Sequence, residues 1–155
     1  MNQIISLGLD DLWRKRAVEL LDIEPEARIL ELGCGTGNLT VKLAQRINNN
    51  GQIIALDFNA KMLQLARQKS AERGLTNKID LIKGDARDLP FSVGEFDYVG
   101  IAFTLRNIEE REEVLQEMKR VTKSGGVIFS LDIFEPTLLI YRQLFLYYFN
   151  HIIPY

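Results

Sequence analysis

The sequence predicts an α/β fold with a doubly wound, mostly parallel sheet. Short apolar segments of five to seven residues alternate with longer segments in which apolar residues recur at helical spacing. Clusters of glycine and asparagine separate these segments. Short buried strands that alternate with helices form parallel sheets, and their crossovers are right-handed. The pattern therefore indicates one sheet with helices on both faces.

The first expected element is an amphipathic helix over residues 9–21, within an N-terminal cover segment at 9–22. Its apolar residues recur at i, i+3 and i+4 spacing, and two aspartates in the first turn suit the helix dipole. The same helix carries the basic run Arg14-Lys-Arg16. We interpret this run as a solvated face, because longer runs are the usual sign of a binding patch.

A strand–turn–helix pattern repeats through the expected core, 27–134. The expected strands are, in chain order, 28–32, 52–56, 78–82, 96–102 and 127–131. The expected helices after the first are 38–47, 60–73, 111–122 and 137–150. Asn59 is a suitable N-cap and Gly74 a suitable stop for the helix at 60–73, and Gly125-Gly126 predicts a turn before the last strand.

Composition limits the class of protein. The chain has 155 residues, of which 46% are hydrophobic and 26% charged, as in a soluble globular protein, and we expect a single domain over 1–155. Its net charge of −2 argues against nucleic acid as a partner, since phosphate binding needs a basic surface. A single cysteine excludes an internal disulfide. Without a signal-peptide pattern or a membrane-spanning segment, a cytoplasmic location is expected.

A glycine turn follows the first expected strand. Gly33, Gly35 and Gly37 stand at alternate positions between that strand and the next helix, where glycine permits positive φ and close approach of a ligand. Unpaired N–H groups at the start of the helix suit a carboxylate or phosphate. Asp57 ends the second strand, about 20 residues after Gly37, where a carboxylate can accept hydrogen bonds from both hydroxyls of a ribose. We expect a nucleoside-containing ligand here.

Two alternative interpretations of this turn are weaker. A dinucleotide site of the G-x-G-x-x-G type would need glycine at position 38, which is Asn38. A purely structural turn does not explain why Glu31 and Asp57 accompany the glycines. Cys34 lies inside the turn, where a helix N-terminus would lower the pKa of a thiol. No histidine or other base accompanies it in the sequence, so we interpret Cys34 as a small packing residue. We expect no metal.

The alternate-glycine loop with its preceding Glu31 resembles the cofactor loop of the class I methyltransferases. That resemblance implies a Rossmann-like sheet and S-adenosylmethionine as cofactor. It also implies that an acidic residue and its neighbour after the third strand, here Asp85 and Ala86 in Gly84-Asp-Ala86, meet the adenine ring. Asp85 taken alone would be interpreted as a surface turn residue.

Motifs along the whole chain resemble those of the quinone-biosynthesis C-methyltransferases of the ubiquinone and menaquinone pathways. The element Leu105-Arg-Asn107 is the most discriminating, because generic class I enzymes seldom carry it. The matching motifs are Met1-Asn2, Ser6-Leu-Gly8, Leu12-Trp-Arg-Lys15, Asp88-Leu-Pro-Phe91, Phe103-Thr-Leu-Arg-Asn107 and Phe149-Asn-His-Ile-Ile-Pro154.

The resemblance also implies roles for individual residues. It implies that Arg106 and Asn107 act on the methyl acceptor, as catalytic residues. Thr36, Asp57, Asp85, Ala86 and Ala102 fall where the family contacts S-adenosylmethionine. The full set that we expect to bind this cofactor surrounds the glycine loop and the strand ends: Glu31, Gly33, Gly35, Thr36, Gly37, Asp57, Phe58, Asp85, Ala86 and Ala102.

The expected reaction is methylation of a ring carbon of a prenylated quinol, either demethylmenaquinol or a ubiquinol precursor. A neighbouring hydroxyl must lose its proton before the carbon becomes a good nucleophile. Because arginine stays protonated, we expect Arg106 to stabilise the oxyanion rather than act as the base. His151 is the one histidine and an alternative base, although a packing or capping role is more common for a residue on an apolar helix near a chain end.

An apolar stripe near the chain end, 138–149, would suit a polyprenyl tail or a peripheral membrane contact. Core packing or burial in a homodimer is the favoured interpretation. The chain departs from the family at Thr104, where glycine is more common, and at both ends. The upstream segment that helps to cover the quinol and the two closing strands are expected to be missing. Two alternatives therefore stay open: a methyltransferase with another small acceptor, and a non-catalytic S-adenosylmethionine-binding fragment or subunit.

Overall fold

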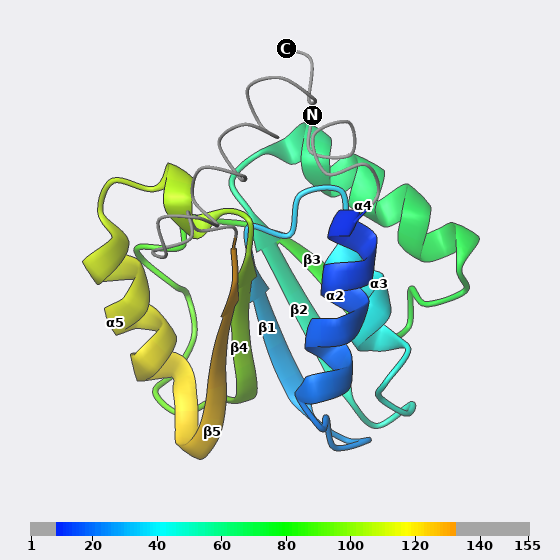
Figure 1. Ribbon diagram of the computed structural model, residues 1–155, viewed down its shortest axis with the longest axis horizontal. Coiled ribbons are helices and arrows are strands. Elements are labelled where there is room, and N and C mark those ends of the chain that lie inside the picture. Colours follow the sequence, from blue (N-terminus) through cyan, green and yellow to red (C-terminus); the bar gives the residue numbers. More distant parts are fainter. Residues whose placement is uncertain (1–8, 133–155) are drawn as a thin grey trace, which may run out of the picture.

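The computed structural model describes residues 9–132 and contains one five-stranded sheet in the order β3-β2-β1-β4-β5 (Figure 1). All four neighbouring pairs are parallel. The strands are β1 (Arg28–Leu32), β2 (Gln52–Asp57), β3 (Ile79–Lys83), β4 (Phe96–Ala102) and β5 (Thr122–Leu131). The predicted doubly wound α/β sheet is confirmed.

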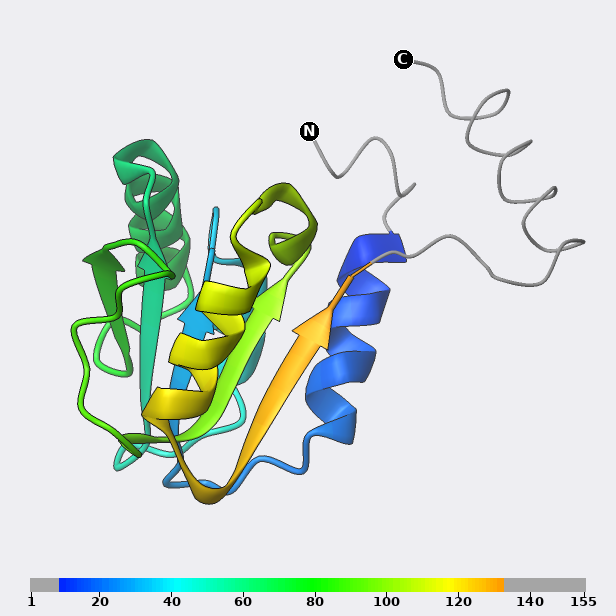
Figure 2. The same ribbon diagram turned by 90° about the vertical axis from the view of Figure 1, so that its left-hand side faces the viewer.

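Helices cover both faces of this sheet, as the two views in Figures 1 and 2 show. One face carries α2 (Leu9–Leu20), α3 (Asn38–Ala44) and α4 (Ala60–Glu72), and the other carries α5 (Arg111–Val121). Successive side chains of a strand point to opposite faces, so β1 places Ile29 in the apolar cluster under α2, α3 and α4 and Leu30 in the cluster under α5.

The helix α3 ends at Ala44, three residues before the predicted end at 47. Arg46 N–H donates to the carbonyl of Leu43, which tightens the last turn. Asn48 N–H donates to the Pro25 carbonyl at 2.7 Å, and Ile47 is buried in the core. The hydrogen bond of Asn48 and the burial of Ile47 require the chain to leave the helical path after Ala44. The apolar periodicity of the sequence does not indicate this early end.

The helix α5 ends at Val121 and the strand β5 begins at Thr122. The predicted helix end at 122 and the predicted turn at Gly125-Gly126 before the strand are therefore wrong. Thr122 pairs with Phe96, and the next pairing joins Val127 to Tyr98. The residues between bulge out of the register, with Gly125 at φ 82°. The glycines therefore form an irregularity within the strand. The expected helix at 137–150 lies outside the described residues.

Candidate functional site

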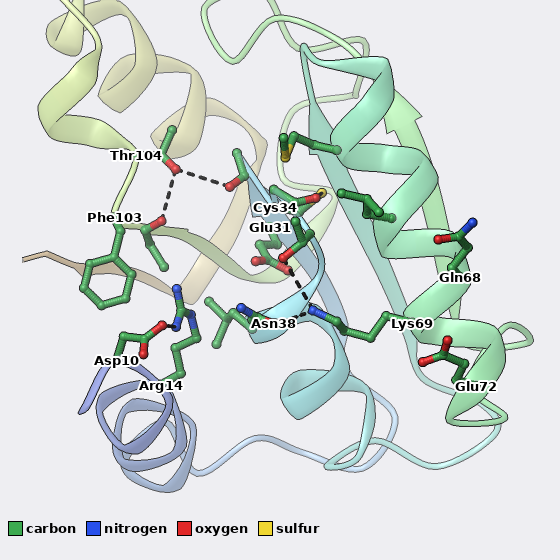
Figure 3. Close-up of a pocket in the computed structure, with 17 residues that line it drawn as sticks. Asp10, Arg14, Glu31, Cys34, Asn38, Gln68, Lys69, Glu72, Phe103 and Thr104 are labelled. Atoms are coloured by element: carbon green, nitrogen blue, oxygen red, sulfur yellow. Dashed lines mark hydrogen bonds and ion pairs between the residues drawn. The ribbon is translucent and has the colours of Figure 1, made fainter. Parts of the chain in front are cut away.

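The candidate functional site lies at the edge of the sheet where the parallel strands end. β1 is central, and the chain continues from β1 to β2 on one side while β4 lies on the other. Ligands of doubly wound sheets bind at such a reversal of strand order. A cavity of about 580 Å³ opens here (Figure 3). Its walls come from the loops after β1 and β4 and from α2, α3 and α4.

The three predicted glycines have different surroundings. All have positive φ: 62° at Gly33, 54° at Gly35 and 78° at Gly37. A Cβ on Gly33 would lie 2.5 Å from Cγ2 of Thr104, and one on Gly37 would lie 3.1 Å from Cβ of Ala66 in α4. No atom lies within 4 Å of a Cβ on Gly35. Gly33 and Gly37 therefore permit close packing, whereas Gly35 faces the open cavity.

Thr104, the departure from the family pattern, closes the loop from the β4 side. Its hydroxyl is within hydrogen-bond distance of the carbonyl oxygens of Gly33, at 3.2 Å, and Ala102, at 3.0 Å (Figure 3). Ala102 and Thr104 both line the cavity. The Thr104 side chain thus connects the ends of β1 and β4, a contact that glycine at this position could not make.

Asp57 supports the glycine loop from the end of β2. Its Oδ2 accepts a hydrogen bond from Gly35 N–H at 2.8 Å, and its Oδ1 accepts one from Asn59 N–H at 2.8 Å. The side chain is buried and is not among the residues that line the cavity. Phe58, beside it, is 75% exposed. Asp57 therefore fixes both the loop and the start of α4.

Glu31 is a buried carboxyl group directly beneath the loop. The hydroxyl of Thr40 on α3 donates to its Oε2 at 2.6 Å. Burial raises the pKa of Glu31 to about 8, against the lowering effects of the Thr40 hydrogen bond and the Arg14 charge. Burial, with the charges of Glu31 and Asp57, also raises the pKa of the Cys34 thiol. The thiol form is favoured there, in agreement with a packing role for Cys34.

The cover helix α2 contributes residues that sequence analysis missed. Arg14 is 8% exposed and lines the cavity together with Asp10. The interpretation of Arg14-Lys-Arg16 as a solvated face is therefore wrong for Arg14 and correct for the other two residues, which are exposed. The physical reason is a long-range contact, since the Arg14 guanidinium lies 4.7 Å from the centroid of the Phe103 ring.

A lysine of α4 forms the opposite wall of the cavity. Lys69 Nζ donates to Asn38 Oδ1 and lies 3.4 Å from the hydroxyl of Thr36 (Figure 3). Burial and the neighbouring charges of Arg14 and Arg73 lower the pKa of Lys69. Thr36, a predicted cofactor residue, is thus part of a polar group that also includes a cation.

The predicted acceptor residues lie just beyond β4, in the 3₁₀ turn η1 (Leu105–Asn107). Arg106 Nη1 donates to Oδ1 of Asp132 at 3.0 Å, and the guanidinium lies 5.9 Å from the Phe103 centroid. Asn107 Nδ2 donates to the Phe103 carbonyl at 3.4 Å. Phe103 thus contacts both Arg14 and Arg106.

Asp85 and Ala86, the predicted adenine contacts, do not line the cavity. Asp85 follows β3 and is paired with Arg87 at 2.7 Å, and hydrogen bonds from Arg87 lower the pKa of its carboxyl group. His151 lies outside the described residues. Between residues 9 and 132, no group of three His, Cys, Asp or Glu side chains could hold a metal ion, and no helix is long and apolar enough to span a bilayer.

Solved structures share the architecture of the sheet. A SAM-dependent methyltransferase from Aquifex aeolicus matches 81% of this chain and 66% of its own, with a TM-score of 0.73 and 21% identity. The YcgJ protein of Bacillus subtilis matches 86% of this chain and 56% of its own, with a TM-score of 0.75 and 19% identity. At these identities the comparison establishes the fold alone.

Relatives of known sequence are more similar. A demethylmenaquinone methyltransferase from Shouchella clausii is 41% identical over 154 residues, and one from Bacillus cytotoxicus is 38% identical over 154 residues. Each match covers 99% of this chain, which spans 65% of the length of these relatives. The pattern of the ubiE/COQ5 methyltransferase family matches residues 1–155. The chain belongs to the ubiE/COQ5 methyltransferase family.

Proposed function

We propose that this chain binds S-adenosylmethionine and takes part in methylating a ring carbon of a prenylated quinol of the demethylmenaquinol type. The observation that carries the proposal is the cavity lined by the glycine loop and by Phe103 and Thr104, the first two residues of the segment that also carries Arg106 and Asn107. The names of the relatives at 38–41% identity support this choice of acceptor. Because the chain spans 65% of their length, its own activity is the question to test.

The residues of the loop fit S-adenosylmethionine. Open space beside Gly35 allows a ligand to reach the backbone, and the hydrogen bond from Gly35 N–H to Asp57 at 2.8 Å holds the loop in this open form. When bound, S-adenosylmethionine supplies an electrophilic methyl group. The residues that we assign to hold it are those around the loop and the following strand ends: Glu31, Gly33, Gly35, Thr36, Gly37, Asp57, Phe58, Asp85, Ala86 and Ala102.

On the acceptor side, Arg106 is the proposed catalytic residue. Its guanidinium is held by Asp132, whose side chain is 2% exposed, and this fixes the position of the positive charge. A fixed cation stabilises the phenolate that forms when a quinol hydroxyl loses its proton, which makes the adjacent ring carbon nucleophilic. Asn107 is proposed to orient the acceptor. His151 stays a candidate for the base.

A direct test compares methyl transfer from labelled S-adenosylmethionine to demethylmenaquinol and to a ubiquinol precursor, side by side. We expect transfer to demethylmenaquinol. Transfer to neither acceptor, with S-adenosylmethionine binding retained in calorimetry, would favour a non-catalytic binding subunit. Transfer to neither and no binding would contradict the proposal altogether.

A further inference from the structure

The cover helix α2 places an ion pair in the wall of the cavity. Arg14 Nη1 donates to Oδ2 of Asp10 at 2.5 Å, and the two side chains are 9% and 6% exposed. Removing an ion pair from water carries a desolvation cost of several kcal/mol for each ion. Elsewhere on α2, the pair between Arg16 and Glu19 remains in solvent, with 68% of the Arg16 side chain exposed. The buried pair is therefore the unusual one.

Several contacts fix the direction of Arg14. The Phe103 ring lies against its guanidinium at 4.7 Å, and Asp10 holds one terminal nitrogen. The guanidinium of Arg14 thus lies beside Asp10 and Phe103 in the wall of the cavity (Figure 3).

The ion pair shares the cavity with the glycine loop. Gly33 and Gly35 line the same space, and the positive charge of Arg14 partly offsets the rise in the pKa of Glu31 that burial causes. The ligand proposed for this loop ends in an α-amino acid, which carries one ammonium and one carboxylate. An adjacent cation and anion in the wall match such a zwitterion in both signs.

We propose that Arg14 and Asp10 bind the amino-acid end of S-adenosylmethionine, with Arg14 donating to the carboxylate and Asp10 accepting from the ammonium. This inference rests on the proposed function of the loop. Asp10 has a second effect, because its bond to Nη1 fixes the guanidinium before the ligand arrives and reduces the entropy lost on binding. The helix α2 is then part of the binding site as well as its cover.

The test compares two ligands that differ at this end. S-adenosylhomocysteine carries the amino acid, whereas 5′-methylthioadenosine retains the adenosine and the thioether and lacks it. In calorimetric titrations of the full chain, Arg14→Met should weaken S-adenosylhomocysteine binding by roughly 10- to 100-fold. Its affinity for 5′-methylthioadenosine should stay within about twofold. Arg14→Lys should restore part of the loss, since an ammonium keeps the charge but not the planar fork.

Arg16→Met on the exposed side of α2 is the matched control and should leave both affinities unchanged. If Arg14→Met does not fold, judged by circular dichroism, Asp10→Asn and Arg14→Lys provide the same comparison between ligands. Equal weakening for the two ligands would assign the ion pair a structural role and overturn the inference, as would no weakening for either. A wild-type chain that binds neither ligand would instead contradict the proposed function.

Discussion

Phe103 connects the two sides of the cavity at the scale of a single residue. Its ring lies 4.7 Å from the guanidinium of Arg14 and 5.9 Å from that of Arg106. Its φ of 54° is in the left-handed region, which residues other than glycine seldom adopt. Phe103 N–H donates to the Leu131 carbonyl at 2.7 Å, which holds this conformation. One strained residue thus positions a cation on each side of the site.

In a chain that transfers methyl groups, Arg106→Ala should lower kcat by roughly 10²- to 10³-fold, the effect of removing one oxyanion stabiliser. The affinity for S-adenosylmethionine should not change, because Arg106 is placed on the acceptor side. Steady-state kinetics with a parallel binding titration would measure both. Arg106→Lys should restore part of the rate.

Lys119→Ala on the exposed face of α5 is the control for this experiment and should leave kcat unaffected. The pH profile adds a second measure. Without the Arg106 charge, the rise of the rate with pH should move to higher pH and persist, since the base itself remains. A wild-type rate for Arg106→Ala would exclude Arg106 from the chemistry.

Glu31 should make the stability of the fold depend on pH. Its carboxyl group has an ordinary pKa of 4.5 and a folded-state pKa of about 8. Between these values the folded chain keeps a proton that the unfolded chain has released. The free energy of unfolding therefore falls as pH rises through this window, by at most about 1.4 kcal/mol per pH unit for one group.

Glu31→Gln removes this titration and keeps an oxygen that can accept the Thr40 hydrogen bond. The variant should gain stability over wild type as pH rises from 5 to 8, measured by urea unfolding at both values. Glu112→Gln, on the exposed start of α5, should change with pH as wild type does. A constant difference between Glu31→Gln and wild type across this range would mean that Glu31 is ionised in the folded protein.

At the scale of elements, a side chain introduced at Gly35, in the loop between β1 and α3, should leave the chain folded and prevent ligand binding. Gly35→Val adds atoms to space where no protein atom lies within 4 Å, beside a backbone with φ of 54°. The expected result is a folded chain, by circular dichroism, with S-adenosylhomocysteine binding abolished in calorimetry, because valine occupies the ligand's space and strains the backbone.

Gly74, at the end of α4, separates these two effects. Its φ is 66° and it also has open space around a Cβ, but it does not line the cavity. Gly74→Val should therefore lose a similar amount of stability and keep ligand affinity. If Gly35→Val binds as tightly as Gly74→Val, the loop has a structural function alone.

Elements whose signals are local can be predicted from the sequence. The strands β1 and β4 begin and end at the predicted residues, because each is a continuous apolar run bounded by turn residues. The glycine loop and Asp57 were equally visible from spacing. The ends of α3 and β5 were not, because the burial of Ile47 and the pairing of Thr122 depend on distant parts of the chain. For the same reason the burial of Arg14 cannot be predicted from the sequence, since it depends on packing against the distant Phe103.

At the scale of the whole molecule, ligand binding should stabilise the sheet, since the cavity joins the loops after β1 and β4. Saturation with S-adenosylhomocysteine at 100 times its Kd adds about 2.7 kcal/mol to the free energy of unfolding. For a domain of this size the Tm should rise by roughly 5–10 °C in a thermal melt. The Gly35→Val variant should show no rise, and a wild-type Tm that stays constant would indicate that the native cavity does not bind this ligand.

The position of β1 between β2 and β4 also determines when the cavity can form during folding. Strands β1 and β2 are joined by one short helical crossover, whereas the contact of Arg28 N–H with Asp97 spans 69 residues of chain. Closing so long a loop is slow, because its entropy is lost before the new contacts form. We therefore expect the part of the cavity wall formed by Ala102, Phe103 and Thr104, at the end of β4, to form late in folding. A ligand of this cavity should slow unfolding and leave the rate of refolding unchanged.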